Sequence, residues 1–155
     1  MAFLFSITDP TGNTLTTGDV SLTVSPTTAI ITDTNMTPGS QTVGIVNVSN
    51  TGTVDEFYQI TVNWSPTGNT SNSAAARLVS ELVVSVTAGS PSVTATPLFT
   101  GSLYNLVDQP ASPGQALPLS VGTENVQFQI TLPSTASTSY EGIDVGFDLV
   151  FVASS

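Results

Sequence analysis

The feature of this sequence that most constrains its fold is a period of two in the placement of apolar residues. Residues 125–132 show it clearly, with Val126, Phe128, Ile130 and Leu132 alternating with polar side chains. Successive side chains of a β-strand point to opposite faces, whereas an amphipathic helix would need a period of about 3.6 residues. The sequence therefore predicts an all-β protein whose antiparallel strands each bury one face.

The same alternation predicts further strands along the chain. The predicted strands cover residues 19–25, 41–49, 54–64, 81–88, 93–99, 125–132 and 143–152. In residues 41–49 we expect Val43 and Ile45 to face the core, with Val48 joining them if a bulge falls near Gly44. Clusters of Pro, Gly, Asn and Asp separate the runs, and strands spaced by such turns are typical of a β-sandwich.

Residues 72–80 instead predict one short helix, with Asn72 or Ser73 as its N-cap and three alanines after it. No shift in composition divides the remainder of the chain. We therefore expect one sandwich domain over residues 14–155, preceded by an N-terminal arm, residues 1–13.

The ionisable residues argue against several classes of function. The chain has no histidine, cysteine or lysine, and eleven acids face a single base, Arg77, for a formal net charge of −10. Without His or Cys there is no zinc peptidase, Ser-His-Asp triad or thiolate enzyme, and nothing in the sequence selects a catalytic pair among the acids. One base cannot neutralise a phosphate backbone, which argues against nucleic acid as a partner. We expect no enzyme, no small-molecule substrate and, without an apolar run of roughly 18 residues, no membrane insertion.

The turn-rich stretch around Asp9, Asn13 and Asp19 carries oxygen ligands that could hold Ca²⁺. The spacing is not that of an EF-hand, and Asp and Asn are also ordinary turn residues, so a chain without any cofactor is the alternative. Residues 55–56 are predicted to form a second acidic loop. If the arm reaches a neighbouring subunit, Asp9 would lie near that loop, and a cation could bridge the two.

Aromatic residues and glycosylation motifs are two further candidate features. Tyr58, Trp64, Tyr104 and Tyr140 could form a sugar-binding platform, or could be ordinary core and strand-end residues. The N-x-[ST] motifs that could accept glycans begin at Asn35, Asn47, Asn63 and Asn69. Of these, Asn69 in a polar loop is the best candidate and Asn63, in a predicted strand, is a weaker one.

The N-terminal arm is itself strand-like. Phe3, Phe5 and Ile7 fall on one face of a strand, and Leu4 and Ser6 on the other. This segment could be the first strand of its own sandwich, or a tail that closes its own core. Alternatively it could be a donor strand that pairs with a sheet edge of a neighbouring subunit.

Several motifs, in this order along nearly the whole chain, resemble those of the TasA/camelysin family of secreted fibre-forming β-sandwich proteins, to which archaeal bundling pili are related. They are AFLFSITDPTGNTLTTGDVSLTV, NMTPGSQTVGIVNVSNTGTVDEFYQITVNW, LFTGSLYNL with the following SPGQALPLS, and VQFQITLPSTASTSYEGIDVGFDLVFVA. The resemblance implies an antiparallel jelly-roll-like sandwich with an extended N-terminal strand. It also implies that this strand completes the sheet of the next subunit. The implied donor residues are Phe3, Leu4, Phe5, Ser6 and Ile7.

The resulting expectation is a structural subunit of an extracellular filament or pilus. It would polymerise with copies of itself after removal of a leader, and it could carry glycans as part of a biofilm matrix. Two other readings remain open. One is a carbohydrate-binding module. The other is a jelly-roll surface-layer or coat protein that assembles by lateral contacts and whose N-terminal strand stays in the sandwich of its own subunit.

Overall fold

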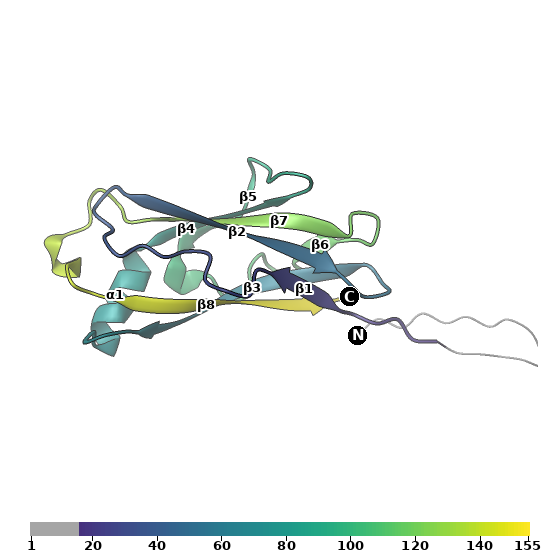
Figure 1. The fold of residues 1–155 in the computed structure, drawn as a ribbon, viewed down its shortest axis with the longest axis horizontal. Coiled ribbons are helices and arrows are strands. Elements are labelled where there is room, and N and C mark those ends of the chain that lie inside the picture. Colours follow the sequence, from purple (N-terminus) through teal and green to yellow (C-terminus); the bar gives the residue numbers. More distant parts are fainter. Residues whose placement is uncertain (1–15) are drawn as a thin grey trace, which may run out of the picture.

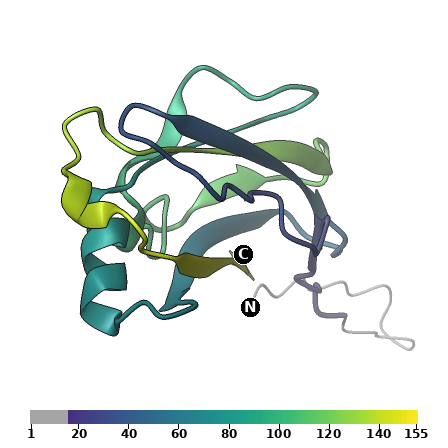
Figure 2. The ribbon, with the colours of Figure 1, turned by 60° about the vertical axis from the view of Figure 1, so that its left-hand side comes forward.

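The computed structural model of the chain describes residues 16–155, which form two facing antiparallel β-sheets with one α-helix (Figures 1 and 2). This architecture confirms the all-β sandwich expected from the alternation. Residues 1–15 lie outside the description, and with them lie the predicted donor strand, Asp9 and Asn13.

The two sheets differ in size. The larger sheet has the spatial order β1 (Leu22–Ser25), β2 (Gln41–Asn50), β7 (Thr123–Thr131), β4 (Val83–Gly89) and β5 (Pro97–Ser102). The smaller sheet has the order β6 (Gln115–Leu117), β3 (Glu56–Pro66) and β8 (Val145–Ser154). The chain crosses between the sheets repeatedly, so strands that are distant in sequence become neighbours, and every pairing is antiparallel.

Helix α1 (Asn72–Glu81) connects β3 of the smaller sheet to β4 of the larger one and lies at one end of the sandwich (Figure 1). Ser71 is its N-cap, because the Ser71 side chain accepts a hydrogen bond from the Ala74 N–H. The expected cap at Asn72 or Ser73 was therefore wrong by one or two residues. Ala75 and Val79 are buried and hold the helix against the sheets. Two 3₁₀ turns, η1 (Leu103–Asn105) and η2 (Thr138–Tyr140), complete the elements.

The core lies between the sheets and follows the predicted alternation of β7 and β3. Its largest fully buried apolar side chains are Tyr58, Phe128, Ile60, Leu103, Leu106 and Leu117. Burial of side chains of this size contributes roughly 1.5–3 kcal/mol each to the stability of the fold.

Strand β2 contradicts the predicted orientation. Val43 and Ile45 are 46% and 49% exposed, and the inward residues are Gly44, Val46 and Val48, in a continuous register with β7 and without a bulge. The reason lies at Gly44: a Cβ atom there would lie 2.6 Å from Cγ1 of Ile31. Only glycine lets the connection between β1 and β2 pack this closely against the inner face.

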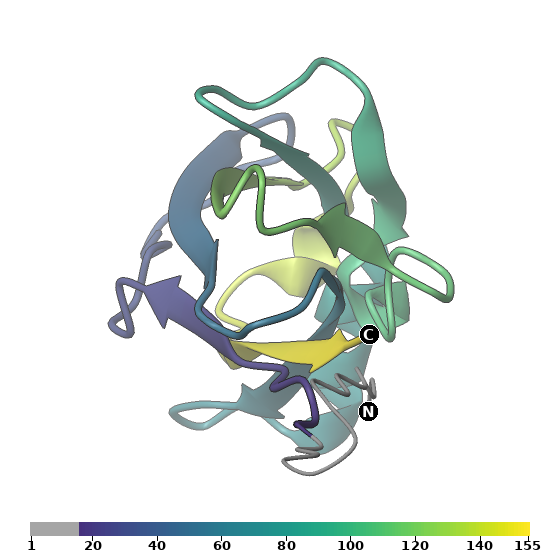
Figure 3. The ribbon, with the colours of Figure 1, turned by 90° about the vertical axis from the view of Figure 1, so that its right-hand side faces the viewer.

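Both sheets leave strand edges without a partner on the same side of the sandwich. Strand β1 pairs only with residues 47–50 of β2, so residues 41–46 have a strand partner in β7 alone. Within the described residues, β8 pairs only with β3. Strand β1 lies beside β8 without joining its sheet (Figure 3). The two sheets are therefore left open to each other along this side.

Candidate functional site

A groove lined mostly by apolar residues runs along the open side of the sandwich, between β8 and the segment that follows β1. Its volume is about 400 Å³. Phe147, Leu149 and Phe151 of β8 form one wall, residues 26–31 form the opposite wall, and Val46 of β2 contributes from between them. The groove lies beside the edge of β8 that has no strand partner among the described residues.

The wall formed by β8 is firmly anchored, although its side chains are only half-buried. The ring of Phe151 packs 5.8 Å from that of Tyr58 and 6.3 Å from that of Phe128, with the second contact edge-on. The next residues on the opposite face, Val150 and Val152, are 43% and 56% exposed. Strand β8 thus presents apolar side chains toward the groove and unpaired backbone groups along its edge.

This combination suits one kind of ligand best, an extended peptide. Unpaired N–H and C=O groups of an edge strand accept another strand, and pockets for alternate side chains select its sequence. The described residues at the groove are apolar or uncharged except Asp148, which is exposed. A peptide whose alternate residues are apolar would therefore be favoured over a charged one.

The predicted calcium ligands are not gathered into a site by the described residues. Asp19 is exposed, and Asp9 and Asn13 lie outside the description. Within residues 16–155 there is no group of three or more His, Cys, Asp or Glu side chains that could hold a metal ion.

Glu56 corrects the expected acidic loop, because its side chain is only 1% exposed and belongs to β3. Its Oε1 accepts a hydrogen bond from the Ser21 N–H, while Oε2 has no partner within the described residues. Burial raises the pKa of this carboxyl, the nearby charge of Asp19 raises it further, and the Ser21 hydrogen bond acts in the opposite direction. Glu56 thus ties the chain just before β1 to the smaller sheet. Asp55 does lie at the surface, where its Oδ1 accepts from the Leu119 N–H at 2.8 Å.

Tyr58 and Glu124 form a second buried polar pair, and it joins the two sheets. The Tyr58 hydroxyl donates to Glu124 Oε1 at 2.6 Å, and Gln115 Nε2 approaches the other oxygen at 3.4 Å. Burial raises the pKa of the Tyr58 hydroxyl, and the hydrogen bond to Glu124 and its charge raise it further. Tyr58 is therefore a core residue and cannot belong to a surface platform.

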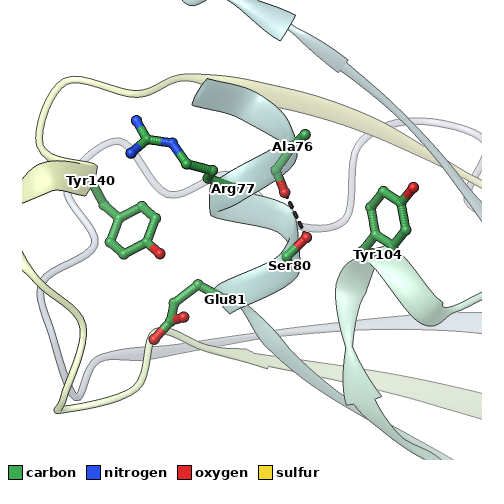
Figure 4. A pocket seen from close by; sticks show the side chains of 6 residues that line it. All are labelled: Ala76, Arg77, Ser80, Glu81, Tyr104 and Tyr140. Carbon is green, nitrogen blue, oxygen red and sulfur yellow. Dashed lines mark hydrogen bonds between the residues drawn. The ribbon is translucent and has the colours of Figure 1, made fainter. Parts of the chain in front are cut away.

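The other three aromatic residues lie near helix α1. Trp64 packs against Tyr104 with ring centroids 6.1 Å apart. Figure 4 shows Tyr104 and Tyr140 on opposite sides of α1, beside an open hollow of about 390 Å³ that Arg77 and Glu81 also line. The four aromatic residues thus do not form one sugar-binding surface.

The four glycosylation motifs differ in accessibility. Asn35, Asn63 and Asn69 are exposed. Asn47 is half-buried on β2, and its Nδ2, the atom that would carry a glycan, donates to Asn125 Oδ1 at 3.2 Å.

Comparison of the chain with known protein families and with curated proteins gives no match. Within residues 16–155, no helix is long and apolar enough to span a membrane. Sequence reasoning missed the groove because it assigned no role to residues 26–31. The available signal was the adjacent pair Ile30 and Ile31, which breaks the period of two and follows a proline.

Proposed function

We propose that this protein is a structural subunit of an extracellular filament. The N-terminal arm of one copy lies in the groove beside β8 of the next copy, as a donor strand. The observation that carries the proposal is the groove itself, an apolar hollow bounded by a strand edge that has no partner within the described residues.

The arm and the groove are chemically matched. The arm has Phe3, Phe5 and Ile7 at alternate positions, which would place three apolar side chains against Phe147, Leu149 and Phe151, while its backbone pairs with β8. Each buried side chain of this kind contributes roughly 1.5–3 kcal/mol, offset by the cost of ordering the arm. Three such contacts with main-chain hydrogen bonds would hold subunits together.

The point at which the described part of the chain begins favours a chain of subunits. Residues 19–21 are hydrogen-bonded to residues 51–56, at the end of the sandwich where β8 finishes, and residues 16–18 extend away from that end (Figure 1). An arm that continues outward from this end can enter a second copy. Such a contact joins two different surfaces, and when its rotation does not close into a ring it produces a fibre.

The surface chemistry is compatible with this role. The net charge of −10 keeps free subunits apart and soluble, and salt screens it over about 8 Å at physiological ionic strength. In an extracellular filament or biofilm matrix, Asn35, Asn63 and Asn69 would be accessible to glycosylation, and Asn69 lies in a turn. The proposal involves no enzyme activity, small-molecule substrate or nucleic acid.

The test is electron microscopy of the purified protein and three variants. We expect filaments from the wild type and from Ser6→Asp, whose new charge lies on the outward face of the arm. We expect none from a variant lacking residues 1–8, or from Phe5→Asp, because a carboxylate buried without a partner costs several kcal/mol. Filaments from Phe5→Asp would contradict the proposal. A variant lacking residues 1–8 that unfolds would instead indicate an arm that completes its own sandwich, as in a coat protein.

A further inference from the structure

Residues 26–31, the groove segment, already occupy one side of the groove in the free subunit. Ile30 and Ile31 are half-buried and pack against the core cluster, facing β8 across the groove. Beneath them, a Cβ on Gly44 would lie 2.8 Å from the Ile30 carbonyl oxygen, so the segment sits directly on the inner face of β2.

The groove segment is held by side chains rather than by its backbone. Within residues 16–155, none of its backbone N–H or C=O groups takes part in a hydrogen bond, and it belongs to no strand or helix. By contrast, the chain is anchored before and beyond this segment: β1 pairs with β2 up to Ser25, and Gly39, eight residues after Ile31, donates to the Leu132 carbonyl at 2.7 Å. A segment of this kind can leave its position while both of its ends stay in place.

We propose that the groove segment is a built-in competitor of the donor strand: it occupies one side of the groove in the free subunit and is displaced when the arm of another copy enters. This inference rests on the proposed function and adds a regulatory step to it. The exchange is favourable in direction, because the incoming arm supplies backbone hydrogen bonds to β8 that the groove segment does not make. It also replaces two isoleucine side chains with two Phe and one Ile.

The displacement has a consequence for assembly. In a free subunit, Ile30 and Ile31 pack over part of the apolar surface beside β8, which limits uncontrolled association through exposed strand edges. Assembly then requires the segment to open, so the rate at which a subunit joins a filament depends on that opening. Holding the segment against β8 should therefore block assembly without altering the arm.

The absence of cysteine from the chain permits a direct test. Thr28 is an exposed residue of the groove segment. Asp148 lies at the rim of the groove, and its exposed side chain alternates with those of Phe147 and Leu149, on the outer face of β8. Thr28→Cys and Asp148→Cys together therefore supply two thiols for a bismaleimide bridge without replacing the apolar side chains of β8 that the arm would contact. A linker with a disulfide in its spacer makes the tether reversible, and mass spectrometry verifies that the bridge is within one chain. The control is the same double variant with both thiols capped by N-ethylmaleimide.

We expect loss of assembly, followed by light scattering, for the tethered protein, and recovery to the rate of the capped control after the linker is reduced. Equal assembly rates for tethered and capped protein would overturn the inference. The proposed function is judged separately by Phe5→Asp in the same assay. If Phe5→Asp still fails to assemble while the tethered protein assembles freely, the donor strand stands and only the displacement is wrong. If Phe5→Asp assembles, the proposed function itself fails.

Discussion

The buried hydrogen bond between Tyr58 and Glu124 offers a quantitative test of how the two sheets are held together. Tyr58 is fully buried and Glu124 is 5% exposed, and the hydroxyl is the only donor within the described residues to Glu124 Oε1. Tyr58→Phe keeps the ring and removes that donor. A hydrogen bond to a charged group contributes about 1.5–3 kcal/mol, and the carboxylate oxygen left behind is buried without its donor.

We therefore expect Tyr58→Phe to lower the free energy of unfolding by about 2–3 kcal/mol. For a chain of this length each kcal/mol corresponds to about 2–4 °C, so Tm should fall by about 4–12 °C. The assay is urea unfolding followed by the fluorescence of Trp64, the single tryptophan, in a Phe5→Asp background, which the proposed function expects to be monomeric.

The matched control is Tyr104→Phe, which removes a hydroxyl from a residue that is 49% exposed. It should change stability by less than about 0.5 kcal/mol. If Tyr58→Phe has an effect as small as this control, the buried pair does not stabilise the sandwich and the reasoning is refuted. Combining Tyr58→Phe with Glu124→Gln should cost less than the sum of the two single changes, because both remove the same interaction.

Three other predictions concern Glu56, β8 and divalent cations. The pKa of Glu56 in the folded protein is raised above its ordinary value of 4.5. The wild type should therefore lose stability as the pH rises from that value through the raised pKa. Urea unfolding of Glu56→Gln across the same pH range should not show this loss. In hydrogen exchange, alternate β8 amides that point away from β3 should become protected in filaments, and unchanged exchange would place the contact elsewhere. If Ca²⁺ bridges subunits at Asp9, EDTA should slow assembly of the wild type and leave assembly of Asp9→Asn unaffected. Equal assembly rates for both proteins, with and without EDTA, would mean that the acidic residues serve only solubility.

The sequence was a good guide wherever only one face of a strand was apolar. The alternation of β7 from Val126 to Leu132 predicted its buried face, because its intervening residues are all polar. In β2, Val43 and Ile45 compete with Val46 and Val48 for the core, and a shift of one residue exchanges the faces. The close contact between Gly44 and Ile31 decides between them, and a contact between distant residues cannot be read from a local pattern.

The candidate site was less predictable for a related reason. The arm can be recognised in the sequence by its alternating Phe and Ile residues. Its proposed acceptor, the groove beside β8, exists only because the fold leaves that strand edge without a partner among the described residues. Strand β1 is short and ends at Ser25, so it covers only part of β2, and β8 is left at the edge of the smaller sheet. The burial of Glu56 was missed similarly, because an acidic pair beside a turn is usually exposed.

The central claim is that the arm of one copy enters the groove of another, and mixing two defective subunits tests it most directly. Phe5→Asp disables the arm and leaves the groove intact, whereas Leu149→Asp places a charge in the groove and leaves the arm intact. Val150→Asp, on the exposed face one residue away, is the control for the groove variant and should still polymerise.

Each defective subunit alone should sediment as a monomer. An equimolar mixture of Phe5→Asp and Leu149→Asp should form a dimer and nothing longer, because only the arm of the Leu149→Asp subunit can enter the groove of the Phe5→Asp subunit. A mixture that stays monomeric while the wild type polymerises would contradict the account, as would polymerisation of either variant alone.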